Sequence, residues 1–254
     1  MLHYLADMTW PEVAQAVADG TTTVILPLGA TEQHGPHLPL GTDTIRAAAL
    51  AKRLAACLPH VLIAPPLPVG CSDEHAGFPG LLSLNTDTLT GVIVDCARRL
   101  AAWGVQRLVI LSAHGGNGQA LNRAAERLRD EVPDLEVWLP DKLPDINEAI
   151  LAVARADHLS AAAVGLHAGE GETSELLYLR PDLVRLDQAA PGFRGDMAEI
   201  IPKLEQVGLR PVTPNGVLGD PTRAEAGRGE RYLVARVEAL AQWLKGSGQK
   251  WGSD

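Results

Sequence analysis

Several histidines and carboxylates in this sequence have the chemistry and the spacing of a metal site. His34, His114 and His167 each follow an apolar segment and are followed closely by glycine. Glu32 and His34 are two residues apart, so in an extended segment both side chains point to the same side and can reach one ion. Asp43 comes nine residues after His34 and can fold back over the same loop. Together these residues predict a divalent metal site.

A second acidic group follows His167 and consists of Glu170, Glu172 and Glu175. Mixed oxygen and imidazole ligands suit zinc, manganese or iron. Two such ions bridged by an aspartate would lower the pKa of a trapped water, which could then attack an amide or a related carbon.

Each of these residues, taken alone, has a simpler explanation. Glu32 alone reads as a solvated loop carboxylate, and Asp43 alone reads as a helix N-cap. His34 and His114 alone read as structural histidines held by hydrogen bonds. The glutamates after His167 fit the first turn of a helix, where the macrodipole favours negative charge. The metal hypothesis therefore depends on their combination.

Other chemistries fit the sequence less well. The Gly115–Gly118 loop resembles a phosphate cradle, but it lacks the GxGxxG spacing and the GK[ST] ending. Neither a GxSxG nucleophile elbow nor an HExxH helix occurs in the sequence. A nucleotide-binding module using this loop remains an alternative, and so does a metal-bound assembly scaffold without catalysis.

The elements that must position these residues alternate along the chain. Apolar runs predict strands at residues 22–28, 60–64, 107–112 and 135–139, and helical periodicity predicts helices over 47–58, 89–100 and 121–128. This alternation predicts an α/β fold with a mainly parallel sheet covered on both faces. Ligands in such folds lie at the carboxyl ends of the strands.

The remaining segments are less regular. The glycine-containing loop 68–85 has a length that usually serves a function. We expect a short helix near 149–156, a polar turn at 167–173 and a final amphipathic helix through 233–244. Residues 191–221, which are rich in glycine and proline, are expected to form a loop.

Composition limits the classes of protein and partner. The chain has 254 residues with a net charge of −9, which argues against nucleic acid or a membrane bound by a broad basic surface. Its three cysteines match neither a disulfide framework nor a CxxC motif. Without a leader or a long apolar run, we expect a cytoplasmic protein. We find no repeat or linker, so we expect residues 1–254 to form a single domain.

The stretch Leu-Pro-Leu-Gly-Ala-Thr-Glu-Gln-His-Gly-Pro-His-Leu-Pro-Leu-Gly-Thr-Asp at residues 26–43 resembles the signature of the creatininase family of metal-dependent amidohydrolases. Three later blocks agree in order and spacing, at residues 113–117, 167–174 and 216–221. The resemblance covers about residues 10 to 245. It implies a three-layer αβα sandwich and a homo-oligomer, commonly a hexamer.

The resemblance also implies roles for individual residues. Glu32 and His34 would each bind one metal, Asp43 would bridge both, and His114 would complete the first. In creatininase the carboxylate for the second metal lies two residues after that histidine and follows a tyrosine. Here those positions are Gly116 and Gly115.

The second metal must then take its carboxylate from another part of the chain. Glu172 is the best candidate, with Glu170 as the alternative. The same turn supplies a catalytic histidine and glutamate in creatininase, and these match His167 and Glu172.

The missing aromatic neighbour speaks against creatinine as the substrate, although creatinine amidohydrolase remains an alternative. Relatives with the glycine version include a formamidopyrimidine deformylase and a peptidase that trims the mycofactocin precursor. We therefore expect two divalent ions, zinc first and manganese or iron otherwise. They would activate water against a C–N bond in a cyclic amide, formamide or short peptide. His167 would stabilise the oxyanion or protonate the leaving nitrogen.

Overall fold

The fold is built on one parallel sheet. The computed structural model describes residues 3–139, 144–195 and 197–246. Within them the sheet has five strands in the order β1-β3-β2-β4-β5. They are β1 His3–Tyr4, β2 Thr23–Leu28, β3 Val61–Ile63, β4 Arg107–Ser112 and β5 Glu136–Trp138. The longest pairing joins β2 to β4, from Thr23 opposite Arg107 to Leu28 opposite Ser112.

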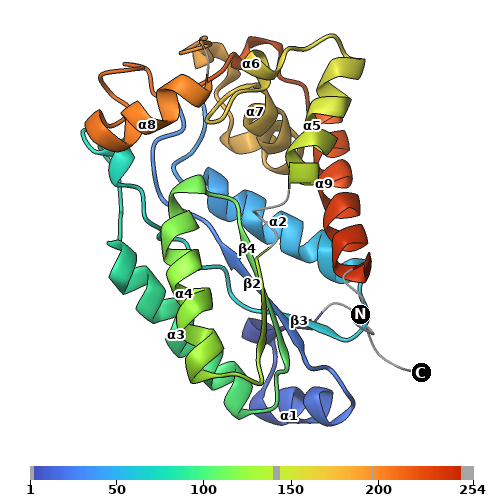
Figure 1. The fold of residues 1–254 in the computed structure, drawn as a ribbon. Helices are drawn as coiled ribbons and strands as arrows, with labels where there is room; N and C mark the ends of the chain where they lie inside the picture. Colours follow the sequence, from blue (N-terminus) through green and yellow to red (C-terminus); the bar gives the residue numbers. More distant parts are fainter. Residues whose placement is uncertain (1–2, 140–143, 196, 247–254) are drawn as a thin grey trace.

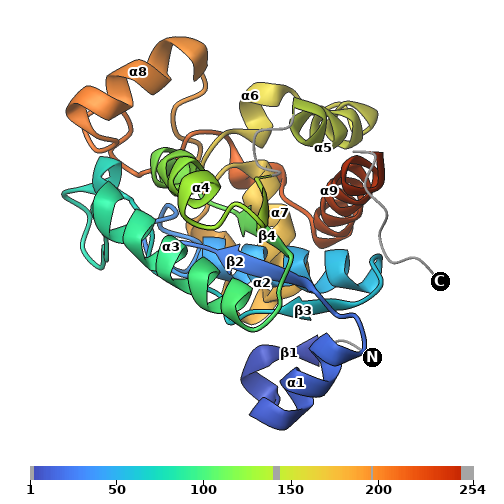
Figure 2. The same cartoon turned by 60° about the horizontal axis from the view of Figure 1, so that its bottom comes forward.

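Helices cover both faces of this sheet, which makes three layers (Figures 1 and 2). One face packs against α3 Thr86–Ala102 and α4 Gly118–Glu131. The other packs against α2 Thr42–Ala56 and α9 Ala226–Gly246. Every residue of β2 is buried, as expected for a central parallel strand with helices on both sides. The α/β class and the αβα layering predicted from the sequence are confirmed.

The chain order puts a topological switch point between β2 and β4. From β2 the chain moves to β3 on one side and then returns to β4 on the other. Loops leaving the carboxyl ends of the two strands therefore diverge and leave a crevice, where ligands of open α/β sheets bind. The segments after Leu28 and Ser112, which carry the predicted metal ligands, leave the sheet at this crevice.

The remaining helices are α1 Trp10–Ala18, α5 Pro144–Ala156, α6 Ala161–Val164, α7 Glu170–Leu179 and α8 Met197–Val207. In Figure 1, α5, α6, α7 and α8 lie beyond the same end of the sheet, and α1 lies at the opposite end. None of the described helices is long and apolar enough to cross a membrane.

Three expectations from the sequence need correction or completion. Residues 191–221 are not a continuous loop, because α8 forms there around an internal Pro202. Its Ile200 and Leu204 pack against Leu209 and Leu218, so tertiary packing overcomes the local proline and glycine content. Asp43 is not an N-cap but lies in the first turn of α2, whose N-cap is Gly41. The two-residue strand β1 was not predicted.

Candidate metal centre

The loop after β2 folds back on itself and so brings Glu32, His34 and Asp43 together. The N–H of Glu32 donates to the carbonyl of Leu40 (3.1 Å), and His34 forms a bridge with Leu38. This closes the loop and places Asp43 in the first turn of α2, beside His34. These three residues therefore come together because the loop turns back on itself, and not because they lie along one extended strand.

The segment after β4 adds His114 and is fixed by Asn117. The Asn117 side chain accepts the N–H of Cys71 (2.9 Å) and donates to the carbonyl of Gly29 (3.2 Å). It thus ties together the loops that follow β2, β3 and β4. Gly116 needs to be glycine, because a Cβ there would lie 2.2 Å from the Cys71 oxygen and 2.4 Å from His114 Nε2.

Glu32, Asp43 and His114 form a first candidate ion position. His114 Nε2 lies 3.3 Å from Glu32 Oε2, and His114 Nδ1 lies 3.4 Å from Asp43 Oδ2. Glu32 and Asp43 are almost fully buried. Burial of two carboxylates this close together is costly unless a cation shares the space.

His34, Asp43 and Glu172 form a second candidate position. His34 Nε2 lies 3.3 Å from Asp43 Oδ1 and 3.7 Å from Glu172 Oε2. The guanidinium of Arg46 borders this position, with Nη1 2.5 Å from Glu172 Oε1 and 3.5 Å from Asp43 Oδ1. Glu172 also accepts the N–H of Ala168 (2.7 Å). The positive charge of Arg46 thus already lies beside the second position.

The buried oxygens without donors indicate where cations fit. Both carboxylate oxygens of Glu32 and the Oδ2 of Asp43 are buried without a hydrogen-bond partner. Buried carboxylate oxygens are normally satisfied, so such orphans need a partner from outside the chain. Mixed imidazole and carboxylate donors are suitable for zinc or manganese. The residues present therefore fit divalent ions.

Backbone carbonyls fix which ring nitrogen of His34 and of His114 carries a proton. His34 Nδ1 lies 3.3 Å from the carbonyl of Glu32, and His114 Nε2 lies 2.8 Å from the carbonyl of Cys71. A carbonyl can only accept, so each of these nitrogens carries the proton. In the neutral rings that metal ligation requires, the lone pairs lie on His34 Nε2 and His114 Nδ1, which face the two candidate positions.

The pKa values in the ion-free site show the same demand for positive charge. Burial alone would lower the pKa of His34, but Asp43 and Glu172 outweigh burial and raise it to about 9. Burial likewise opposes the charged form of His114, but Glu32 and Asp43 raise its pKa to about 10. Protons on these imidazoles thus supply charge where ions would bind.

The carboxylates respond in the opposite direction. Burial would raise the pKa of Glu32, but the imidazoles of His114 and His167 hold it at about 2. Asp43 behaves in the same way, because His34, His114 and Arg46 outweigh burial and lower its pKa. Both groups therefore carry negative charge at neutral pH.

The structure distinguishes Glu172 from Glu170, although both belong to the first turn of α7. Glu172 faces His34 and Arg46. Glu170 is directed toward α9 instead, and its oxygens accept from Ser174 of α7 (2.6 Å) and Tyr232 of α9 (2.7 Å). Of these two residues only Glu172 reaches the candidate centre.

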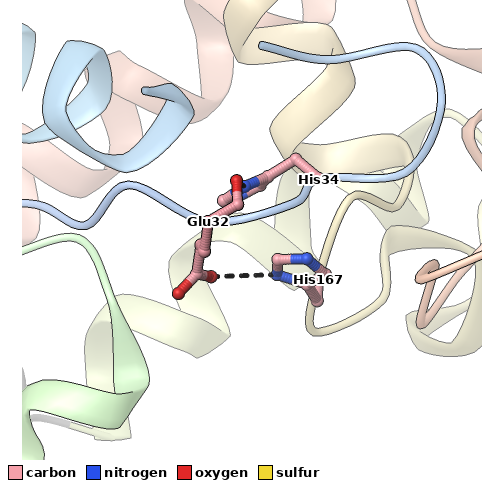
Figure 3. Close-up of side chains that lie close together, drawn as sticks. All are labelled: Glu32, His34 and His167. Carbon is pink, nitrogen blue, oxygen red and sulfur yellow. Dashed lines mark hydrogen bonds and ion pairs between the residues drawn. The ribbon is translucent and has the colours of Figure 1, made fainter. Parts of the chain in front are cut away.

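His167 comes from the turn before α7 and lies beside Glu32 and His34 (Figure 3). Its Nδ1 is 3.7 Å from Glu32 Oε1, and its ring centroid is 4.2 Å from that of His34. The next residue, Ala168, has a φ of 49°, a left-handed conformation that costs energy for a residue with a Cβ. The strained turn aims the imidazole into the site.

Glu74 and His75, which were not predicted from the sequence, also reach the centre. They lie in the loop 68–85, whose length was the only signal of a function. His75 Nε2 is 3.2 Å from Glu32 Oε1. Glu74 Oε1 is 3.6 Å from His114 Nε2 and would lie 2.6 Å from a Cβ at position 116, so it fills space that a side chain there would need.

A cavity of about 1080 Å³ opens onto the centre. Glu32, His75, His114 and His167 lie in its wall. Apolar residues from the far side complete it, among them Ile201, Leu204, Val207 and Leu209. This volume is at the upper end of the range for small-molecule pockets.

Known proteins resemble this chain over nearly its whole length. A family model described as creatinine amidohydrolase matches residues 6–244. The chain belongs to the creatininase family. It is 36% identical over 250 residues to a mycofactocin precursor peptide peptidase of Mycobacterium ulcerans (strain Agy99), covering 94% of this chain and 88% of the relative. It is 30% identical over 255 residues to a creatinine amidohydrolase of Pseudomonas putida, covering 95% and 96% of the two chains.

Solved creatininase structures agree with the fold. A manganese form of creatininase superposes with a TM-score of 0.80 at 27% identity, covering 98% of this chain and all of the other. A mutant creatininase described as the Zn-Zn type gives a TM-score of 0.76 at 28% identity, with the same coverage. Creatininase relatives thus bind manganese or zinc, and this chain is a creatininase-family hydrolase that acts on C–N bonds.

Proposed function

We propose that this protein hydrolyses an amide bond in a short peptide with the aid of two divalent metal ions. Zinc is the first choice, and manganese or iron is the alternative. The observation that carries the proposal is the set of three buried, donor-free oxygens on Glu32 and Asp43, of which Glu32 lies in the wall of the cavity. Ions at this place would lower the pKa of a shared water and polarise the substrate carbonyl.

The chain's own residues would hold these ions in two adjacent positions. Glu32, Asp43 and His114 would hold the first. His34, Asp43 and Glu172 would hold the second, with Asp43 common to both. Arg46 would keep Glu172 in place through its short contact with Oε1.

His167 would move the proton during hydrolysis. Its Nε2 lies 2.7 Å from the carbonyl of Gln33, so Nε2 carries the proton and Nδ1 offers a lone pair toward Glu32. Nδ1 would take a proton from the attacking water and give it to the leaving nitrogen, as a general base and then a general acid. In this tautomer His167 does not offer an N–H to an oxyanion, so protonation of the leaving nitrogen is the role that fits.

A peptide is favoured over a smaller amide by the size of the cavity and its apolar far wall. The name of the Mycobacterium relative points in the same direction. Creatinine amidohydrolase and formamidopyrimidine deformylase activities remain the competing assignments within the family.

The test is a side-by-side assay of three substrates with metal-loaded protein. They are a synthetic C-terminal segment of the mycofactocin precursor peptide, creatinine and a formylaminopyrimidine. We expect cleavage of the peptide at a kcat/KM at least tenfold above that for the other two. Creatinine turnover at an equal or higher kcat/KM would contradict the peptide assignment.

A homo-oligomer, expected from the family, is tested by light scattering on the same preparation.

A further inference from the structure

The orientation of the Gln33 side chain is fixed by two backbone groups. Its Oε1 accepts the N–H of Gly35 (2.8 Å), and its Nε2 donates to the carbonyl of Gly216 (3.1 Å). If this amide were flipped, its NH₂ group would face the N–H of Gly35 and its oxygen would face the carbonyl of Gly216, so neither contact would be a hydrogen bond. Gly35 and Gly216 both have positive φ, and a Cβ at Gly216 would lie 1.9 Å from Gln33 Oε1. The close approach to Gln33 therefore requires glycine at position 216.

This orientation determines which nitrogen of His75 carries a proton. Gln33 Nε2 lies 3.1 Å from both His75 Nδ1 and His167 Nε2. His167 Nε2 must itself be a donor, because it lies 2.7 Å from the carbonyl of Gln33. The second hydrogen of the Gln33 amide therefore goes to His75 Nδ1, which accepts it. The proton of the His75 ring is then on Nε2.

The N–H of His75 has no acceptor among the described residues. Its closest carboxylate oxygen, Glu32 Oε1, lies 3.2 Å away but lacks a hydrogen-bond partner, because the contact does not have hydrogen-bond geometry. Glu74 Oε1, at 3.9 Å, is too distant. His75 lines the cavity, so its N–H is available to a bound molecule.

His75 thus differs from the other imidazoles of the centre. In the neutral form that metal ligation requires, His34 and His114 present lone pairs to the centre, as His167 does, whereas His75 presents an N–H. The ring centroids of His75 and His167 are 4.6 Å apart. The oxygen and nitrogen of one amide group are about 2.3 Å apart, from standard bond lengths, so both rings can contact the same amide.

We propose that His75 is a catalytic residue whose Nε2–H donates a hydrogen bond to the carbonyl oxygen of the scissile amide. The proposal rests on the amide hydrolysis proposed above. The water oxygen bonds to the carbonyl carbon, and the carbonyl oxygen gains negative charge, which the hydrogen bond stabilises without proton transfer. The C–N bond then breaks, and the water proton reaches the leaving nitrogen through His167. Gln33 is a positioning residue that fixes the His75 tautomer.

The test compares His75→Leu with His75→Gln on the precursor-peptide segment. Leucine removes the donor, and we expect kcat to fall about 10²- to 10³-fold, the usual loss for one oxyanion donor. Glutamine places an amide N–H near the same point and should restore activity to within about tenfold of the native rate. Leucine and glutamine variants with equal kcat, or a leucine variant within about threefold of the native kcat, would overturn the proposal.

Two measurements separate this role from a structural one and from metal binding. Glu32, Glu74 and His75 also lie close enough together to hold an ion. The proposal makes His75 a hydrogen-bond donor instead of a ligand, so both variants should keep the native metal content, and loss of an ion in both would contradict the assignment. A phosphinic analogue of the peptide, which carries a tetrahedral anionic centre, should bind the leucine variant about 100-fold more weakly.

A third measurement does not depend on turnover. In protein with ¹⁵N-labelled histidine, long-range ¹H–¹⁵N spectra should show His75 protonated on Nε2 and unprotonated on Nδ1. The reverse tautomer would overturn the proposal even if the enzyme hydrolyses peptides. Should the native protein hydrolyse no amide while His75 has the expected tautomer, the proposed reaction fails and the assignment of the donor nitrogen stands.

Discussion

Two fully buried glutamates in this protein, Glu32 and Glu170, have opposite surroundings. Glu170 Oε1 accepts from Ser174 and pairs with Arg228 at 3.0 Å, and its Oε2 accepts from Tyr232. Every oxygen of Glu170 therefore has a partner from the chain. Because these partners belong to α7 and α9, the carboxylate fastens the two helices to each other.

Glu32 has the same charge and the same burial, but neither of its oxygens has a hydrogen-bond donor. The Nε2 atoms of His75 and His114 lie 3.2 Å and 3.3 Å from its two oxygens, but neither contact has the geometry of a hydrogen bond. The difference shows that burial and charge do not by themselves mark a functional carboxylate. What marks it is the absence of donors within the chain, which reserves its oxygens for a ligand.

Replacement of Glu32 tests the functional side of this comparison and has the largest expected effect. In Glu32→Gln the charge that would hold an ion is lost, so we expect hydrolysis to fall at least about 10³-fold. The ion-free variant should also unfold more easily than the ion-free native protein at pH 7.5, because it lacks the charge that raises the pKa of the buried His114. Steady-state kinetics and urea unfolding measure the two quantities. Full activity in this variant would contradict the role of Glu32.

Replacement of Glu170 tests the structural side. Glu170→Gln leaves Arg228 without its nearest charge partner inside the protein, and breaking a buried pair in this way costs about 3–5 kcal/mol. Arg228 keeps Asp157 at 3.4 Å, so we expect a loss of stability of about 3 kcal/mol.

Metal content and kcat of Glu170→Gln should be native at temperatures where the variant is folded. A loss of bound metal without a loss of stability would show that the two glutamates do not differ as described.

His167 sharpens the comparison, because it contacts Glu32 without being proposed as a ligand. We expect His167→Ala to lower kcat about 100-fold, the lower range for removal of a general acid or base. Bound metal should stay at the native level, as measured by mass spectrometry of the metal. Loss of one ion in this variant would instead make His167 a ligand.

Proton release on metal binding is the smallest predicted effect. In the ion-free protein the pKa values of His34 and His114 are raised to about 9 and about 10, so both rings are protonated at pH 7.5. Metal ligation requires neutral imidazole, so loading should release about two protons per chain. Apparent affinity should therefore rise with pH up to about 9 to 10.

Calorimetry in buffers of different ionisation enthalpy measures this number of protons. A histidine whose pKa is higher in the folded than in the unfolded protein contributes its full stabilisation at pH values below the pKa of the unfolded protein. The same ion-free protein should therefore lose stability as pH rises through about 9 to 10. Release of no protons at pH 7.5 would exclude His34 and His114 as ligands.

The sequence was sufficient for the sheet and for most of the centre, and physical reasons explain this. Strands β2 to β5 and helices α2 to α4 follow strong apolar periodicities. Glu32, His34, Asp43 and His114 lie at strand ends that one sheet edge must bring together. Segments without such periodicity were misjudged, and α8 is the clearest case, since its Pro202 suggested a loop.

The rest of the centre depends on contacts that spacing does not encode. His75 reaches Glu32 from the loop 68–85, whose Cys71 backbone is held by Asn117 of the segment after β4. The choice of Glu172 over Glu170 is made by Tyr232, about sixty residues later in the chain. Which imidazoles present lone pairs is decided by backbone carbonyls, and these are set by the fold alone.

The number of divalent ions bound per chain tests the central claim most directly. Protein stripped with chelator, dialysed to equilibrium against zinc and analysed by mass spectrometry of the metal should contain close to two zinc ions. Glu32→Gln and Asp43→Asn should both contain fewer. Native protein that binds less than about 0.2 ions per chain and yet hydrolyses amides at the full rate after chelation would contradict the account.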